Sequence, residues 1–124
     1  MSQKAKTEHK IQAAYIAWHR RQSFPGWIFA VPNGGARDAI TGALLRAEGV
    51  APGVPDVFYA WPCGGYAGLW LEFKTPTGTV SCVQKSMIAD LRAAGYACEV
   101  VRSGGAAREI VERYLSKKYS AQNA

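Results

Sequence analysis

The stretch that decides the fold is residues 52–74, PGVPDVFYAWPCGGYAGLWLEFK. It contains two apolar and aromatic runs, 57–61 and 68–74, which have the length and composition of β-strands. A short Gly-rich connection separates them, and connections of this length favour an antiparallel hairpin. We therefore predict a hairpin in the middle of the sheet.

Helices and single strands alternate outward from this hairpin. Apolar residues at three- and four-residue steps, with Gly and Pro as stops, predict helices over about 7–22, 39–48, 81–94 and 106–118. Strand-like runs at 27–31 and 96–101 complete the order, which predicts an α/β fold with a mixed four-stranded sheet flanked by helices. The 124 residues have the size of one domain, with residues 1–6 and 119–124 expected to be frayed.

The chain is basic, with 15 Lys and Arg against 9 Asp and Glu and a net charge of +6. This balance favours nucleic acid as a partner. No apolar run is long enough to cross a membrane, and the polar N-terminus lacks a secretory pattern. We therefore expect a cytoplasmic, intracellular protein associated with nucleoid or phage DNA. The three cysteines form no CxxC pair, so neither a disulfide framework nor a zinc knuckle is indicated.

Side-chain alternation in the second strand of the hairpin places a carboxylate beside an ammonium group. Phe73 points to one face with the apolar side chains, whereas Glu72 and Lys74 share the other. Asp56 stands at the start of the first strand, and in an antiparallel hairpin it lies beside the end of the second. We therefore predict that Asp56 meets Glu72 and Lys74 in one site.

Two converging carboxylates suit a hard cation. Mg²⁺ or Mn²⁺ is usually held by one or two carboxylates, with water and substrate phosphate oxygens as further ligands. Such an ion polarises a phosphoryl group and lowers the pKa of a bound water. Lys74 can then orient that water or stabilise the charge of the transition state. The pattern predicts metal-dependent hydrolysis of phosphodiester bonds.

Two further polar residues lie on the inner stripes of predicted helices. Gln84 faces the sheet and needs a partner that the site offers, although it can also be a boundary residue of a first helical turn. Glu8 can equally be a first-turn carboxylate favoured by the helix dipole. Alone, Pro-Asp is common at turns and Glu-x-Lys is usually a solvated ion pair. Apolar surroundings favour a site, because an idle buried charge pair would be costly.

These residues resemble a known pattern. Pro55-Asp56, Glu72-x-Lys74 and Gln84, laid over strand, strand and helix, resemble the PD-(D/E)XK nuclease superfamily. A wider string is similar to the VRR-NUC family, the virus-type replication–repair nucleases, in its small stand-alone form. It adds Pro32-Asn33-Gly34-Gly35, Arg37, Gly49-Val50, Pro52-Gly53-Val54, Leu71, Gly78 and Ser81. The likeness covers nearly the whole chain and implies a restriction-endonuclease-like core.

The resemblance also implies a role for each residue of the predicted site. Asp56, Glu72 and the backbone carbonyl of Phe73 would bind the divalent metal. Lys74 would be the catalytic lysine, and Gln84 would support the active site.

Residues outside the hairpin would complete the site in such a nuclease. Glu8 would correspond to the family's additional acidic residue near the metal, with direct ligation left open. Asn33, Gly34 and Arg37 would lie in a substrate-binding loop beside the site, where Arg37 contacts phosphate or serves only the loop structure.

We therefore expect a Mg²⁺- or Mn²⁺-dependent endodeoxyribonuclease that acts in replication, recombination or DNA repair. The resemblance implies a homodimer that cuts branched DNA such as four-way (Holliday) junctions, since two symmetric cuts need two active sites. The alternatives are a non-catalytic DNA-binding protein, a nuclease for flaps or linear duplex, and a structural or assembly protein.

Overall fold

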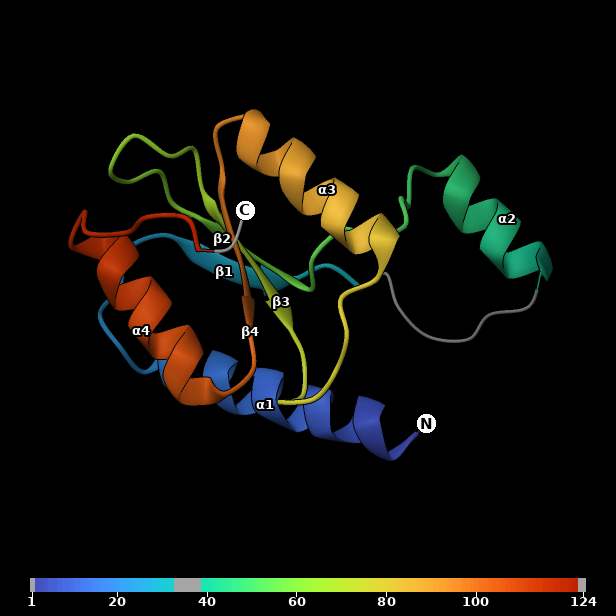
Figure 1. Ribbon diagram of the computed structural model, residues 1–124, viewed down its shortest axis with the longest axis horizontal. Helices are drawn as coiled ribbons and strands as arrows, with labels where there is room; N and C mark the ends of the chain where they lie inside the picture. The colour runs from blue at the N-terminus through green and yellow to red at the C-terminus, as the bar shows by residue number, and fades with distance from the viewer. Residues whose placement is uncertain (1, 33–38, 123–124) are drawn as a thin grey trace.

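The computed structural model describes residues 2–32 and 39–122, which form four helices and four strands. The elements in chain order are α1 (Gln3–Arg20), β1 (Trp27–Ala30), α2 (Ala39–Ala47), β2 (Val57–Ala60), β3 (Leu69–Phe73), α3 (Cys82–Ala93), β4 (Ala97–Val101) and α4 (Gly104–Leu115) (Figure 1). Each predicted helix and strand is present, and the bounds differ mainly at the helix ends.

The sheet has the order β1-β2-β3-β4 and mixes both pairing directions. The predicted hairpin is confirmed, because β2 and β3 pair antiparallel with Val57 opposite Leu71. The outer pairs differ in direction: β1 is antiparallel to β2, whereas β4 is parallel to β3. The mixed four-stranded sheet flanked by helices that the element order predicts is therefore the observed fold.

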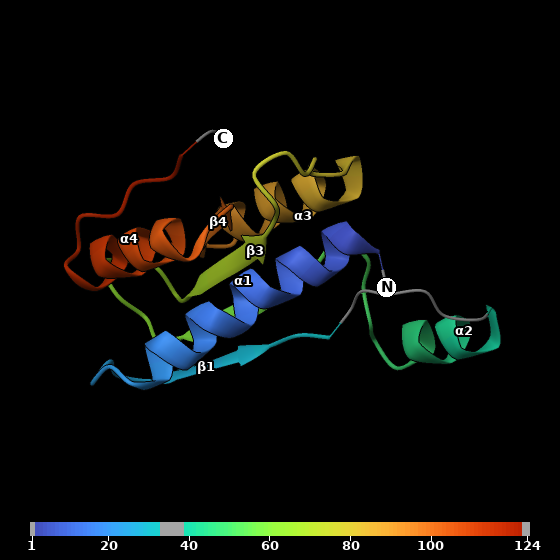
Figure 2. The same cartoon turned by 90° about the horizontal axis from the view of Figure 1, so that it is seen from below.

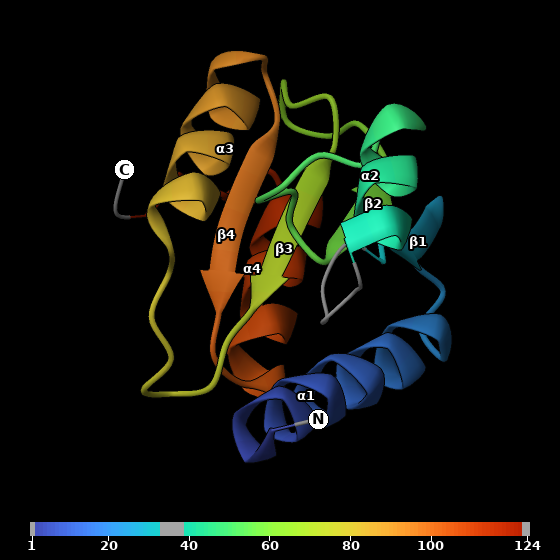
Figure 3. The ribbon, with the colours of Figure 1, turned by 90° about the vertical axis from the view of Figure 1, so that its right-hand side faces the viewer.

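Helices cover the two faces of the sheet unequally. α1 and α4 pack together beneath one face, and α3 lies on the other face, over β4 (Figures 2 and 3). The core between the sheet and the α1–α4 layer is made of fully buried residues from every strand and both helices, among them Tyr15, Val57, Tyr59, Leu71, Phe73, Val111 and Tyr114. α2 stands away from the sheet, and its Ile40 and Leu44 are exposed.

Two helices begin earlier than the apolar periodicity predicts. α1 starts at Gln3, because the Ser2 side chain caps it by accepting from the N–H of Ala5 at 3.1 Å. Residues 3–6, expected to be frayed, therefore belong to this helix. α4 starts at Gly104, because Ser103 accepts from the N–H of Ala106 in the same way. Two glycines in its first turn hide this start in the sequence.

The chain after α4 is held by side-chain contacts. The hydroxyl of Tyr119 and the N–H of Gln122 both donate to the Glu99 carboxylate, which is also paired with Arg92 at 3.1 Å. Residues 119–122, expected to be frayed, therefore close over the outer side of β4. None of the helices in the described part of the chain is both long and apolar enough to cross a membrane.

A close approach fixes the turn that leads into β2. Gly53 has a φ of +84°, and a Cβ atom built there would lie 2.8 Å from the carbonyl oxygen of Val83 in α3. Only glycine combines that backbone conformation with that contact. The turn before Pro55 and Asp56 is therefore packed directly against the first turn of α3.

His19 is a buried titratable group in the core. Its Nδ1 atom lies 2.9 Å from the hydroxyl of Tyr15, and its ring packs edge-on against Tyr59 and Phe24. The side chain is buried, and burial lowers the pKa of His19 from 6.5 to about 4. The folded protein therefore favours the neutral imidazole.

The depressed pKa of His19 predicts a stability loss in mild acid. The folded state binds this proton less readily than the unfolded chain. The contribution of neutral His19 to the unfolding free energy is therefore complete above pH 6.5 and declines as the pH falls toward 4. Replacement His19→Phe should remove on the order of 3 kcal/mol of the pH dependence of unfolding between those values. Urea titrations measure it, with exposed His9→Gln as the control. If the unfolding free energies of the wild type and His19→Phe depend on pH in the same way, the lowered pKa assigned to His19 is refuted.

Candidate active site

The hairpin brings Asp56 to the end of β3. Asp56 immediately precedes Val57, which pairs with Leu71, so Asp56 lies opposite Glu72. Its Oδ2 atom accepts a hydrogen bond from the N–H of Phe73 at 2.8 Å. The predicted meeting of the first and second strands of the hairpin is therefore present.

The side chains of Glu72 and Lys74 lie side by side at the end of β3, on the face opposite Phe73 and the apolar core. The Lys74 Nζ atom is 3.7 Å from Glu72 Oε2, and the two side chains are 11% and 5% exposed. This pair is therefore neither a solvated surface ion pair nor part of the packed core, where Phe73 on the opposite face is fully buried against Tyr15.

Gln84 serves the helix and the site together. Its Oε1 atom accepts from the N–H of Ser81, while Ser81 accepts from the N–H of Gln84, which forms a capping box at the start of α3. Its Nε2 atom donates to Glu72 Oε2 at 3.1 Å. Both interpretations of Gln84 from the sequence therefore apply: it begins the helix and orients the carboxylate.

Glu8 reaches the same region from α1. Because α1 begins at Gln3, Glu8 does not lie in the first helical turn, so the helix dipole does not account for it. Its negative charge raises the pKa of both Asp56 and Glu72, which places it near them. The Oε2 atom of Glu8 is buried without a hydrogen-bond partner among the described residues.

Burial and mutual repulsion raise the pKa values of the two hairpin carboxyls. The pKa of Glu72 is raised to about 8, with desolvation as the largest cause; the charges of Asp56 and Glu8 act in the same direction, and Lys74 opposes them. Desolvation is also the largest cause that raises the pKa of Asp56, opposed by its hydrogen bond from Phe73. Among the described residues, Lys74 is the cation that lowers these pKa values, and one lysine does not neutralise three carboxylates, so this part of the site favours an additional positive charge or bound protons.

The donor set fits a hard cation with an incomplete protein ligand shell. Among residues 2–32 and 39–122, no three His, Cys, Asp or Glu side chains converge tightly enough to form a complete ligand set. Mg²⁺ needs no such set, because one or two carboxylates and several waters usually hold it. Asp56 and Glu72 supply that number, and the unpartnered oxygen of Glu8 is a further acceptor nearby.

Strand geometry offers a backbone oxygen at the same edge. The N–H and C=O of one residue in an extended strand point to the same side, and the N–H of Phe73 points to Asp56. The ladder register puts Phe73 opposite Pro55, which has no N–H to donate to the Phe73 carbonyl. The carbonyl of Phe73 is therefore aimed at the edge where the carboxylates meet.

Three expected residues cannot be placed. Asn33, Gly34 and Arg37 lie outside the described residues.

Arg102 has no role that could be predicted from the sequence, yet its side chain reaches the loop after Lys74. A single arginine at the end of a strand carries no signal for such a contact.

The candidate site is not part of the cavity that α3 and β4 line. A cavity of about 690 Å³ lies between α3, β4 and the C-terminal segment, lined by residues that include Ile88, Arg92 and Glu99. Asp56, Glu72 and Lys74 are not among its lining residues. The convergence of charged groups, rather than this cavity, therefore identifies the site.

Known proteins share this arrangement of sequence and fold. The sequence profile of the VRR-NUC domain matches residues 3–105. A solved structure described as a VRR_NUC domain protein is similar to this chain with 26% identity and a TM-score of 0.78, and the match covers 89% of this chain and 88% of the other. A comparison with curated proteins gave no match.

Because the pKa of Glu72 is raised, we predict that its negative charge destabilises the fold of the metal-free protein. A carboxyl whose folded pKa is raised from 4.5 to about 8 contributes its full stability below pH 4.5 and loses it as the pH rises through 8. Glutamine imitates the protonated form at every pH. In EDTA, Glu72→Gln should therefore exceed the wild type in unfolding free energy by about 2 to 4 kcal/mol at pH 9 and match it at pH 4.5.

Denaturant titrations across this range test the expectation. The matched control is Glu109→Gln on α4, where the carboxylate is 66% exposed and the substitution should leave the pH dependence unchanged. A difference between Glu72→Gln and wild type that stays constant from pH 4.5 to 9 would contradict the buried, repelled carboxylate.

Proposed function

The chain belongs to the VRR-NUC family, a nuclease-type family, and on that premise we propose that this protein is a divalent-metal-dependent endodeoxyribonuclease. The observation that carries the proposal is the convergence of Asp56, Glu72 and Glu8 beside Lys74, with the Glu72 side chain and one oxygen of Glu8 buried. Such a set has excess negative charge that a cation would neutralise. Phosphodiester hydrolysis is the reaction that carboxylates, a cation and a lysine support together.

The residues at the ends of β2 and β3 would hold Mg²⁺ or Mn²⁺. Asp56 and Glu72 would be carboxylate ligands, the backbone of Phe73 would add its carbonyl, and Glu8 would ligate directly or through water. When bound, the ion supplies Lewis-acid polarisation of the phosphoryl group and a lowered pKa for its water. The strand backbone fixes these donors, so little rearrangement is needed before substrate binds.

Lys74 acts on the reacting groups, and Gln84 orients Glu72. Lys74 holds its ammonium group 3.7 Å from Glu72 and donates toward the attacking water or the developing phosphoryl charge. Gln84 keeps Glu72 in one orientation through its 3.1 Å hydrogen bond. The largely buried position of the lysine strengthens its electrostatic effect, because less water screens it.

The substrate that we propose is branched DNA, such as a four-way junction, cut by a homodimer. The net charge of +6 supports a polyanionic substrate. Two symmetric cuts require two copies of this site. Exposed Ile40 and Leu44 on the projecting α2 offer apolar surface of the kind that interfaces bury. Asn33, Gly34 and Arg37 would bind the substrate, with Arg37 in contact with a phosphate.

A non-catalytic DNA-binding protein is the main alternative function. Its basic charge would serve equally well, but its carboxylates would repel phosphates and cost stability without a compensating use. The intact set of Asp56, Glu72 and Lys74 therefore favours catalysis. A nuclease for flaps or linear duplex would use the same site, and only the choice of substrate separates it from our proposal.

Removal of either catalytic side chain should separate cleavage from binding. We expect Glu72→Ala and Lys74→Ala each to lower cleavage at least 100-fold, about 3 kcal/mol of transition-state stabilisation, while the Kd for DNA changes little. Gel electrophoresis of end-labelled DNA with Mg²⁺ or Mn²⁺ measures cleavage, and gel mobility in Ca²⁺ measures binding. Glu109→Gln is the control on an exposed carboxylate. Wild-type DNA binding without products at any divalent metal would establish the non-catalytic alternative.

A panel of DNA structures tests the proposed substrate and assembly. We expect the wild type to cut a four-way junction at least tenfold faster than a flap or a linear duplex of the same sequence, with paired cuts across the junction. Light scattering should give twice the 13.4 kDa mass of the chain. A monomer that cuts flaps or duplex as fast as junctions would replace the branched-DNA proposal with the alternative nuclease.

A further inference from the structure

The loop between β3 and α3, residues 74–81, connects two residues of the candidate site. It begins at Lys74, directly after β3, and ends at Ser81, the N-cap of α3. Gln84 is the third residue of that helix and bonds to both Ser81 and Glu72. The placement of this loop therefore sets where Lys74 and Gln84 stand relative to Glu72.

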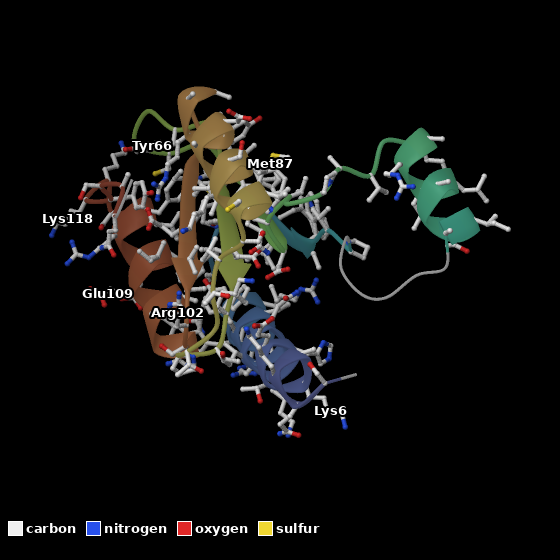
Figure 4. All side chains as sticks on the ribbon, turned by 45° about the vertical axis from the view of Figure 1, so that its right-hand side comes forward. Lys6, Tyr66, Met87, Arg102, Glu109 and Lys118 are labelled. Atoms are coloured by element: carbon white, nitrogen blue, oxygen red, sulfur yellow. The ribbon has the colours of Figure 1, made fainter. Side chains whose placement is uncertain are left out.

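Arg102 holds this loop at two points. Its Nη1 atom donates to the carbonyl oxygens of Thr75 at 2.8 Å and of Gly78 at 2.6 Å. The side chain comes from the junction of β4 and α4, far along the chain from the loop (Figure 4). The N–H of Gly78 also donates to the Thr75 carbonyl at 3.1 Å, so one cation spans both ends of a hydrogen-bonded turn.

The backbone of Val101, the residue before Arg102, binds the backbone of Lys74. The carbonyl of Val101 accepts from the N–H of Lys74 at 3.0 Å, which extends the parallel β3–β4 ladder by one residue. Val101 itself is fully buried in the core. Lys74 is thus tied to a rigid strand through its N–H, and the residue that follows it is tied to the guanidinium through its carbonyl.

The turn also lies close to the side chain of Lys4 in α1. A Cβ atom added at Gly78 would lie 3.0 Å from both Thr75 Oγ1 and the Cε atom of Lys4 in α1. Thr75 is itself buried. Arg102 therefore provides the side-chain hydrogen bonds that hold the turn, and a guanidinium is suited to this task because its fixed planar donors keep one geometry.

We propose that Arg102 is a positioning residue for the nuclease reaction, acting through the Thr75–Gly78 turn on Lys74 and Gln84. This rests on the proposed function of the same site. Arg102 uses its Nη1 donors on backbone oxygens, which favours a positioning role over a phosphate contact. It differs from the metal ligands, which the hairpin positions without it.

Arg102→Lys tests the proposal, because it keeps the charge and loses the planar donors. We expect kcat on cleavable DNA to fall at least tenfold, with KM and the Kd for DNA in Ca²⁺ within twofold of wild type. Amide hydrogen exchange of Gly78 should accelerate in the variant, while that of β4 is unchanged. The stabilisation of the fold by Mg²⁺ should persist, since Asp56 and Glu72 keep their places.

Two comparisons separate positioning from a general loss of structure. Arg113→Lys, at an exposed arginine of α4, should leave kcat unchanged. The double variant Arg102→Lys with Gln84→Ala should lose less than the product of the two single effects, because both act on the same carboxylate and lysine. Multiplicative losses, or a loss that follows the melting temperature, would overturn the proposal.

The remaining outcomes are equally decisive. Normal kcat in Arg102→Lys overturns the positioning role while the nuclease stands. A weakened Kd in Arg102→Gln, with Arg102→Lys normal, identifies a phosphate contact instead and also overturns it. A wild type that binds DNA but never cleaves it overturns the proposed function itself and this inference with it.

Discussion

The site depends first on one hydrogen bond, from the N–H of Phe73 to the side chain of Asp56. In the β2–β3 ladder the residue opposite Phe73 is Pro55, which cannot donate and so ends the regular pairing. The Asp56 carboxylate takes over as acceptor for the Phe73 N–H. It thereby ties the start of β2 to the end of β3 beyond the last ladder pair. Strand geometry points the Phe73 carbonyl to the same edge as its N–H, and the hairpin register brings Asp56 beside Glu72. A proline and an aspartate in sequence thus convert the end of a hairpin into a cluster of oxygens.

That cluster opposes the stability of the fold that builds it. Each carboxylate loses hydration on burial, and the charges repel one another, which is why the pKa of Glu72 is raised to about 8 despite Lys74 at 3.7 Å. The surrounding elements keep the arrangement because their own contacts are independent of it: an apolar core on the opposite face, and the close approach of Gly53 to Val83. The fold tolerates a strained polar edge because the sheet packs well beneath it.

Features that depend on local interactions could be predicted from the sequence, whereas contacts between residues far apart in the chain could not. The hairpin, the faces of Glu72 and Lys74, and the approach of Asp56 follow from a two-residue period and a short connection, which are local. Helix starts were less accessible, because the caps at Ser2 and Ser103 precede the apolar periodicity, and Gly104 lowers the helix propensity after the second cap. Contacts between a distant side chain and backbone carbonyls, such as those of Arg102, leave no pattern at all. The ties of Tyr119 and Gln122 to Glu99 are of the same long-range kind.

Glu8 shows how tertiary structure decides between two local explanations. On spacing alone it is either a first-turn carboxylate or a member of the site. The Ser2 cap starts α1 at Gln3, which removes the first explanation, and the shared electrostatics with Asp56 and Glu72 favour the second. A buried carboxylate oxygen without a hydrogen-bond donor is costly to keep, so it requires a partner that none of residues 2–32 and 39–122 supplies. A hydrated cation held between the ends of β2 and β3 would provide that partner, since its bound waters are strong donors to carboxylate oxygens. The unpartnered oxygen in α1 and the excess charge in the hairpin thus support the same proposal from two separate elements.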